Sequence, residues 1–262
     1  MSSYWLKQSS TKALFPDIEW TRPEQRSRAG KLAIVGGNKL SFVAVATAYA
    51  EATAVGAGQV RVVLPDALKP VIPVTILDTV FTASTPSGGM SKEDIGTVIA
   101  ATEWADHTLC IGDAGRNSET AIVYETLLDS SKPMTVTRDA VDLLRSSPQR
   151  LVERPQTTLV LSFAQLQKLF QALYYPKMLS FSMQLNLLVD TLHKFTVSYP
   201  VMIVTYHQNQ LLIAKDGQVI TQEFDEPMKI WRGTVATSIA TYLLWSPNKP
   251  LESATSAIFH LQ

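Results

Sequence analysis

Residues 31–65 read KLAIVGGNKLSFVAVATAYAEATAVGAGQVRVVLP, and this stretch decides the fold. It opens with an apolar run at residues 32–35, which is typical of a buried parallel strand. A pair of glycines ends that run, and small and apolar side chains then recur at helical spacing. Two further glycines end the helix before a second apolar run at residues 60–63. Strand, helix and strand in this order predict a right-handed crossover within a largely parallel sheet.

The same alternation continues to the end of the chain. Strands are predicted at residues 108–111, 133–137, 158–161 and 201–205, and helices at residues 93–101, 121–128, 140–146, 163–172, 183–195, 233–245 and 251–261. A hairpin is predicted at residues 210–222, because a turn-forming stretch, KDGQ at residues 215–218, separates two apolar runs. These patterns place the protein in the α/β class.

Length and composition indicate the number of domains and the kinds of partner to expect. With 262 residues, 46% of them hydrophobic, the chain is long enough for one sizeable α/β domain. We therefore expect residues 1–262 to form a single domain, with residues 1–30 as a lead-in segment. The 23 basic and 23 acidic side chains balance, which argues against nucleic acid or a membrane surface as a partner. No secretory signal or apolar run of roughly 20 residues is visible, so we expect a cytoplasmic protein.

Few residues carry an obvious chemical signal. Cys110, the single cysteine, lies in an apolar run and is predicted to be a buried thiol and not a nucleophile. The four histidines are far apart in the sequence, so they predict no metal site. The motifs of nucleophile-elbow hydrolases, P-loop enzymes and Rossmann dehydrogenases are missing, which argues against those three classes.

The glycine turns resemble those of a known family. Residues 35–38, VGGN, and residues 56–58, GAG, resemble the two turns that open the ADP/ATP-dependent NAD(P)H-hydrate dehydratases. Residues 111–117, IGDAGRN, resemble that family's Ile-Gly-Pro-Gly-Leu-Gly turn, and residues 137–141, TRDAV, resemble its Asp-Ala-Asp-Ala-Leu segment. The resemblance implies a ribokinase-like three-layer sandwich, with a central mostly parallel sheet and a small antiparallel ribbon near the C-terminal part.

The resemblance also implies a site. The residues that would bind substrate are Gly36, Gly37, Asn38, Gly112, Gly115, Asn117 and Asp139. The residues that would bind nucleotide phosphate, at a helix N-terminus, are Arg232, Gly233 and Thr234. The implied ligands are NAD(P)H hydrate and ATP or ADP with Mg²⁺, and a homo-oligomer is a further expectation. For Asp139 an alternative stays open, namely that it caps the helix that follows it.

Four positions depart from the family's chemistry. Where the family has histidine, glutamate, lysine and aspartate, this chain has Ser162, Gln165, Thr205 and Ala236. Residues 227–251 contain neither aspartate nor glutamate, so the helix start at residue 233 lacks a carboxylate for general-base catalysis. The catalytic residues therefore stay unassigned.

Two functions follow from the sequence. One is a divergent nucleotide-dependent NAD(P)H-hydrate dehydratase. The other is a non-catalytic nucleotide-binding or structural protein of the same fold. The missing aspartate, histidine and lysine favour this second function as regards mechanism, whereas the family resemblance favours the first. A third interpretation, a small-molecule kinase of the wider ribokinase group, relies on the same missing aspartate.

Overall fold

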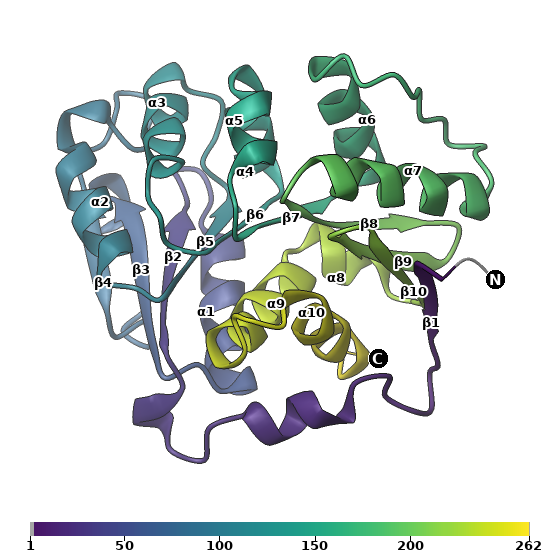
Figure 1. The fold of residues 1–262 in the computed structure, drawn as a ribbon. Coiled ribbons are helices and arrows are strands. Elements are labelled where there is room, and N and C mark those ends of the chain that lie inside the picture. The colour runs from purple at the N-terminus through teal and green to yellow at the C-terminus, as the bar shows by residue number, and fades with distance from the viewer. Residues whose placement is uncertain (1–2, 262) are drawn as a thin grey trace.

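A single sheet forms the centre of the molecule (Figure 1). The computed structural model describes residues 3–261, and within them ten strands lie in the order β1-β10-β9-β8-β7-β6-β5-β2-β3-β4. The strands are β1 Trp5–Gln8, β2 Lys31–Gly36, β3 Gln59–Pro65, β4 Thr79–Thr82, β5 His107–Gly112, β6 Met134–Thr137, β7 Thr157–Leu161, β8 Met202–His207, β9 Gln210–Lys215 and β10 Gln218–Glu223.

The sheet is parallel except at β9. This strand pairs antiparallel with both β8 and β10, which confirms the predicted hairpin. The strands from β8 through β5, β2 and β3 to β4 all pair in parallel. The expected α/β class, mostly parallel sheet and small antiparallel ribbon are therefore confirmed.

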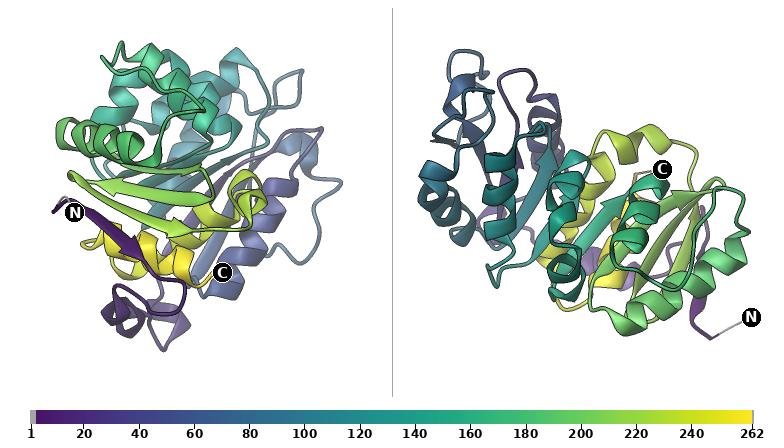
Figure 2. Two further views of the ribbon diagram at one scale, coloured as in Figure 1. Left: turned by 90° about the vertical axis from the view of Figure 1, so that its right-hand side faces the viewer. Right: turned by 90° about the horizontal axis from the view of Figure 1, so that it is seen from above.

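Helices cover both faces of the sheet. They are α1 Val43–Val55, α2 Ile95–Glu103, α3 Ser118–Leu127, α4 Asp139–Leu143, α5 Pro148–Glu153, α6 Phe163–Ala172, α7 Leu185–Ser198, α8 Pro227–Trp231, α9 Thr234–Trp245 and α10 Pro250–Phe259. Helices α2 to α7 lie on one face, and α1, α9 and α10 lie on the other (Figure 1). Seen from the β1 edge, in the left view of Figure 2, the sheet separates the green helices from the yellow ones.

Alternation along the strands explains the two cores. Ile34 and Leu109 belong to the core beneath α1 and α9, whereas their neighbours Val35 and Cys110 belong to the core beneath α2 to α7. Successive side chains of a strand point to opposite faces, so a strand covered on both faces is apolar throughout. This arrangement is the physical origin of the uninterrupted apolar runs in the sequence.

Some elements differ from the sequence predictions. Strand β1, inside the expected lead-in, pairs in parallel with β10 and was not predicted. Helices α5 and α8 were also missed because each is short, although the proline at the start of each is a typical helix-start signal. The strand-like run at residues 71–83 forms only the short strand β4, and residues 71–78 stay irregular. Strand β1 depends on a partner that is distant in the sequence, whereas α5 and α8 are too short to show a helical period.

The order in which strands are added to the sheet reverses between β2 and β5. From β2 the chain moves outward to β3 and β4, and then returns to pair β5 with the other side of β2. The carboxyl ends of β2 and β5 thus lie at the switch point of the sheet, which is where α/β proteins of this type bind ligands. None of the helices among the described residues is long and apolar enough to cross a membrane.

Candidate functional site

The loops after β2 and β5 meet backbone to backbone. The Gly37 N–H donates to the carbonyl oxygen of Gly112 at 2.8 Å. A Cβ atom on Gly36 would lie 2.4 Å from that same oxygen, so only glycine fits there. The side-chain amide of Asn38 donates to the carbonyl oxygen of Asp113. The structure therefore brings the predicted residues of the two turns together, and they contact each other.

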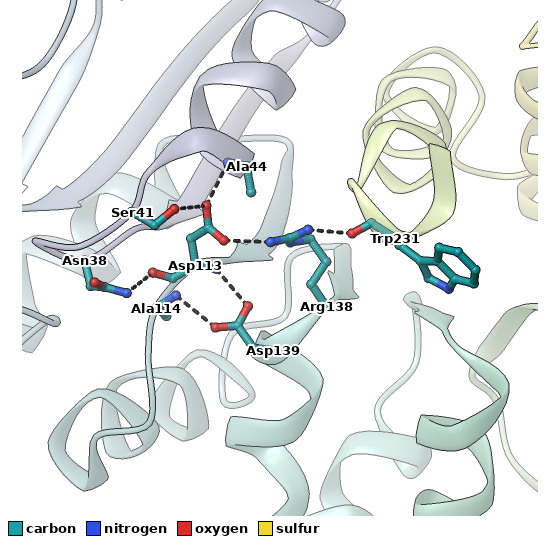
Figure 3. Close-up of polar contacts among 8 residues, drawn as sticks. All are labelled: Asn38, Ser41, Ala44, Asp113, Ala114, Arg138, Asp139 and Trp231. Carbon is teal, nitrogen blue, oxygen red and sulfur yellow. Dashed lines mark hydrogen bonds and ion pairs between the residues drawn. The ribbon is translucent and has the colours of Figure 1, made fainter. Parts of the chain in front are cut away.

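Asp113 lies at the centre of this contact (Figure 3). Its Oδ2 accepts from the Ser41 hydroxyl at 2.9 Å and from the Ala44 N–H at 2.8 Å. Ala44 lies in the first turn of α1, where backbone N–H groups lack partners within the helix. The Asp113 carboxylate thus serves as a cap for α1 from a different loop.

Arg138 neutralises the Asp113 carboxylate. Its Nη2 donates to Asp113 Oδ1 at 2.6 Å, and the two side chains are only 26% and 11% exposed. Its Nη1 donates to the carbonyl oxygen of Trp231, just before α9 (Figure 3). The backbone of Arg138 is strained, with φ of +56°. Sequence analysis missed this residue, which joins the β5 loop to the start of α9.

Asp139 binds the same loop from the other side. Its two oxygens accept from the Asp113 N–H at 2.8 Å and from the Ala114 N–H at 3.1 Å. The cap position of α4 is occupied by Arg138, and no side chain among the described residues caps this helix. The interpretation of Asp139 as the helix cap is therefore wrong, because its carboxylate binds the β5 loop instead. A Cβ atom on Gly112 would lie 2.0 Å from Asp139 Oδ1, which explains that glycine.

Asn117 caps α3. Its side-chain oxygen accepts from the Glu119 N–H at 2.8 Å and from the Thr120 N–H at 3.3 Å. Arg116 is exposed beside it. Beneath these loops the Tyr124 hydroxyl donates to the Val35 carbonyl oxygen. Burial raises the pKa of Tyr124 well above its usual range, and nearby groups, including Asp139 and Asp113, raise it further.

Gly233 places the start of α9 against the end of β5. Its φ is +90°, and a Cβ atom there would lie 2.4 Å from Ile111 Cδ1 and 3.4 Å from Arg138 Cδ. Among residues 3–261, no side chain caps α9, and its first turn carries no acid. Thr234 is partly buried and Arg232 is exposed, whereas Ala236 is fully buried. The start of α9 thus carries backbone N–H groups without partners inside the helix and the positive end of the helix dipole, which are the features with which helix N-termini bind anions.

Several solved structures are similar to this one. A ribokinase-like superfamily protein from Enterococcus faecalis has a TM-score of 0.74 at 15% identity, over 100% of this chain and 88% of the other. The ADP/ATP-dependent NAD(P)H-hydrate dehydratase from Bacillus subtilis has a TM-score of 0.60 at 12% identity, over 94% and 86%. The phosphomethylpyrimidine kinase from Clostridium difficile has a TM-score of 0.55 at 11% identity, over 88% and 98%.

The fold is ribokinase-like. At these identities the structural likeness establishes the fold and leaves the reaction open. No protein-family model matches the sequence, and the search of curated proteins found no match. The B. subtilis dehydratase was co-crystallised with ATP and Mg²⁺ and soaked with CoA.

Two of the positions that depart from the dehydratase family have a structural role in this ribokinase-like chain. Ser162 and Gln165 form a reciprocal capping box at the start of α6. The Gln165 amide also donates to the Arg138 carbonyl oxygen at 2.7 Å and to Asp142 at 3.1 Å. The Ser-x-x-Gln spacing is a sequence signal from which this cap was predictable. These side chains support the loop that carries Arg138.

Two adjoining cavities lie along this edge of the sheet. The first, about 420 Å³, is lined by Arg138, Ser162, Gln165 and Trp231 among others. The second, about 450 Å³, lies beside the start of α3, and its lining residues include Gly115, Asn117 and the cations Arg116, Arg145 and Lys168. Both cavities share Asp139, Asp142 and Lys168 in their walls.

Proposed function

We propose that this protein binds a nucleotide through the N-terminus of α9 and does not catalyse the dehydration of NAD(P)H hydrate. One observation carries the proposal. Both oxygens of Asp113 and both oxygens of Asp139 accept hydrogen bonds from the protein itself. Both carboxylates line the 420 Å³ cavity, but each of their oxygens already holds a loop of the protein in place.

The position of the family's catalytic aspartate supports the proposed loss of catalysis. The resemblance aligns the family's aspartate with Ala236, whose side chain is fully buried and aliphatic. A general base must come within hydrogen-bond reach of the proton that it removes. Ala236 offers no acceptor, and residues 227–251 contain no acid that replaces it.

The binding side of the site supports retention of a ligand. The start of α9 has no acidic residue in its first turn, and Arg138 lies beside it. Arg232 adds an exposed cation. Backbone N–H groups with adjacent guanidinium groups are a favourable environment for phosphate. The structural neighbour that was co-crystallised with ATP makes a nucleotide the first ligand to test.

A thermal-shift and turnover experiment tests both parts of the proposal. ATP or ADP should raise the melting temperature, because a ligand that binds only the native state stabilises it. Incubation of hydrated NADPH with the protein and either nucleotide should leave the hydrate intact. Nucleotide-dependent dehydration would overturn the proposed loss of catalysis, and the lack of any shift would overturn the proposed binding.

A charge placed at the start of α9 identifies the binding site. Thr234→Glu should abolish the nucleotide-dependent shift, since its carboxylate repels phosphate and yet suits the positive end of the helix. The matched control is Asn186→Glu, which introduces the same charge at an exposed position in the first turn of α7. Equal nucleotide responses of the two variants would place the ligand elsewhere.

The second cavity makes NADPH a second ligand for the same screen. Arg116, Arg145 and Lys168 line this cavity, and none of these side chains has an ion pair within the described residues. Asn117 and Gly115, which the resemblance assigns to substrate, lie in the same wall. Several unpaired cations around one cavity favour a ligand with several phosphates.

A further inference from the structure

A separate cavity of about 250 Å³ lies at the opposite edge of the sheet, where the parallel strands begin. Its wall includes His107 at the start of β5, Thr158 in β7, Met202 at the start of β8 and Leu243 near the end of α9. These strands are five or six residues long, or roughly 17–20 Å, and the candidate site lies beyond their other ends. None of the described residues in this wall also lines a cavity of the candidate site. The cavity is therefore a different place on the molecule.

Two buried side chains in this wall have a polar atom without a partner. Thr158 is only 3% exposed, and its hydroxyl has no hydrogen-bond partner within residues 3–261. His107 is 1% exposed, and its Nε2 shares a hydrogen bond with Thr135 Oγ1 at 2.8 Å. Its Nδ1 has no partner in the described part of the chain. Nearly all buried polar groups in proteins are hydrogen-bonded, so these two require a partner that the chain itself does not supply.

The sheet places both groups on one face. Thr135 in β6 pairs with Thr158 in β7, and Thr158 pairs with Met202 in β8. Paired residues of neighbouring strands point to the same side, and Met202 belongs to the core beneath α1 and α9. Thr158 therefore points toward that core, and His107 bonds Thr135 on the same side. The unpaired hydroxyl and imidazole thus border the same space, which Leu243 of α9 also borders.

The rest of the wall is mostly apolar, rigid and without net charge. It contains five prolines, whose rings fix φ and so hold these loops in place without a ligand. They are Pro133, Pro155, Pro200, Pro247 and Pro250. The cation Lys215 donates to the carbonyl oxygen of Pro200 and to Asp216, both at 2.7 Å. Burial lowers the pKa of His107 to about 3, so its imidazole is neutral at neutral pH and the wall offers no free charge to an ion.

We infer that this cavity binds an uncharged molecule of one ring that carries a hydroxyl group, such as a phenol. An apolar cavity of about 150 Å³ can hold benzene, so about 250 Å³ is enough for a ring with a substituent. The hydroxyl both donates and accepts, so it pairs with Thr158 and with His107 whichever ring nitrogen carries the proton. Mostly apolar cavities with a few converging polar groups are typical of small-molecule sites. The inference does not depend on the proposed nucleotide binding.

Titration of the wild-type protein with phenol and with toluene, followed by ligand-observed NMR, tests the inference. Toluene has nearly the same shape as phenol and lacks the hydroxyl. In a wholly apolar cavity toluene binds more tightly, because the phenol hydroxyl loses its water without gaining a partner. In this cavity phenol should bind at least as tightly as toluene. Weaker binding of phenol than of toluene, or binding of neither, would overturn the inference.

A variant then assigns the hydrogen bond to this cavity. Thr158→Val keeps the shape of the side chain and suits a strand. It should weaken phenol binding by about tenfold, the effect of one net hydrogen bond, and leave toluene binding unchanged. Thr205→Val is the matched control, because Thr205 is a fully buried threonine of β8 whose hydroxyl also lacks a partner among the described residues and which does not line this cavity. A cooperative melt must show that each variant is folded. Wild-type affinity for phenol in a folded Thr158→Val protein would overturn the inference.

Discussion

The contact between Asp113 and Arg138 allows a quantitative prediction about stability. In this pair the Nη2 and Oδ1 atoms lie 2.6 Å apart, and the side chains are 26% and 11% exposed. Breaking a fully buried ion pair from one side costs about 3–5 kcal/mol, and the partial exposure of Arg138 reduces that figure. We expect Asp113→Asn to lower the free energy of unfolding by about 2–3 kcal/mol. Asparagine keeps the shape of the side chain and tolerates the positive φ of residue 113.

A double-mutant cycle isolates the pair from its surroundings. Urea denaturation of the wild type, Asp113→Asn, Arg138→Gln and the double variant should give a coupling energy of about 2 kcal/mol. Asp129 and Arg150 provide the matched cycle, because this pair has the same 2.6 Å distance but exposures of 71% and 49%. Its coupling energy should stay below about 0.5 kcal/mol, as is usual for exposed pairs.

Comparison of the two coupling energies shows whether the Asp113–Arg138 ion pair stabilises the site. If the Asp113–Arg138 coupling were as small as that of the surface pair, the ion pair would not hold the β5 loop to α9. The site would then owe its shape to backbone packing between Gly37 and Gly112. A change in the denaturant slope of a variant would show that the denatured or native state had changed, and that variant would be left out of the cycle.

Three other measurements follow from buried groups. Gly36→Ala should cost about 2–3 kcal/mol because its Cβ would lie 2.4 Å from a carbonyl oxygen, whereas Gly96→Ala in α2, with nothing within 4 Å, should add about 0.5–1 kcal/mol. Similar urea midpoints for the two variants would contradict this steric explanation. Burial lowers the pKa of His107 from 6.5 to about 3, so the unfolded state alone gains its proton as the pH falls between these values. Stability should therefore drop by about 2 kcal/mol from about pH 7 to about pH 5 through His107. His107→Gln should remove that part of the pH dependence, and an unchanged slope would refute it. Burial raises the pKa of Cys110 to about 12, so iodoacetamide should label the unfolded protein quickly and the native protein only as it unfolds. Rapid labelling of the native protein would contradict this.

Much of the fold was predictable from local patterns. The apolar runs of β2 and β5 are uninterrupted because both faces of these strands are covered, and the helix predicted at residues 163–172 is α6. The hairpin of β9 and β10 followed from its turn residues. Each of these features depends on residues that are neighbours in the sequence. The edge strand β1 was not predictable in this way, because its partner β10 lies more than 200 residues away.

In the candidate site, too, some features depend on neighbouring residues and others on residues that are distant in the sequence. The sequence by itself determined that glycine turns follow β2 and β5 and that residues 227–251 lack an acid, because both are properties of short stretches. Only the tertiary structure decided what the acids and cations near the turns do. Arg138 is 25 residues from Asp113 and 93 from Trp231. The three meet because β6, which ends just before Arg138, pairs with β5, which ends just before Asp113, and because α9, which follows Trp231, packs against both strands. Charge pairing of this kind depends on distance in space, which a linear pattern of residues does not contain.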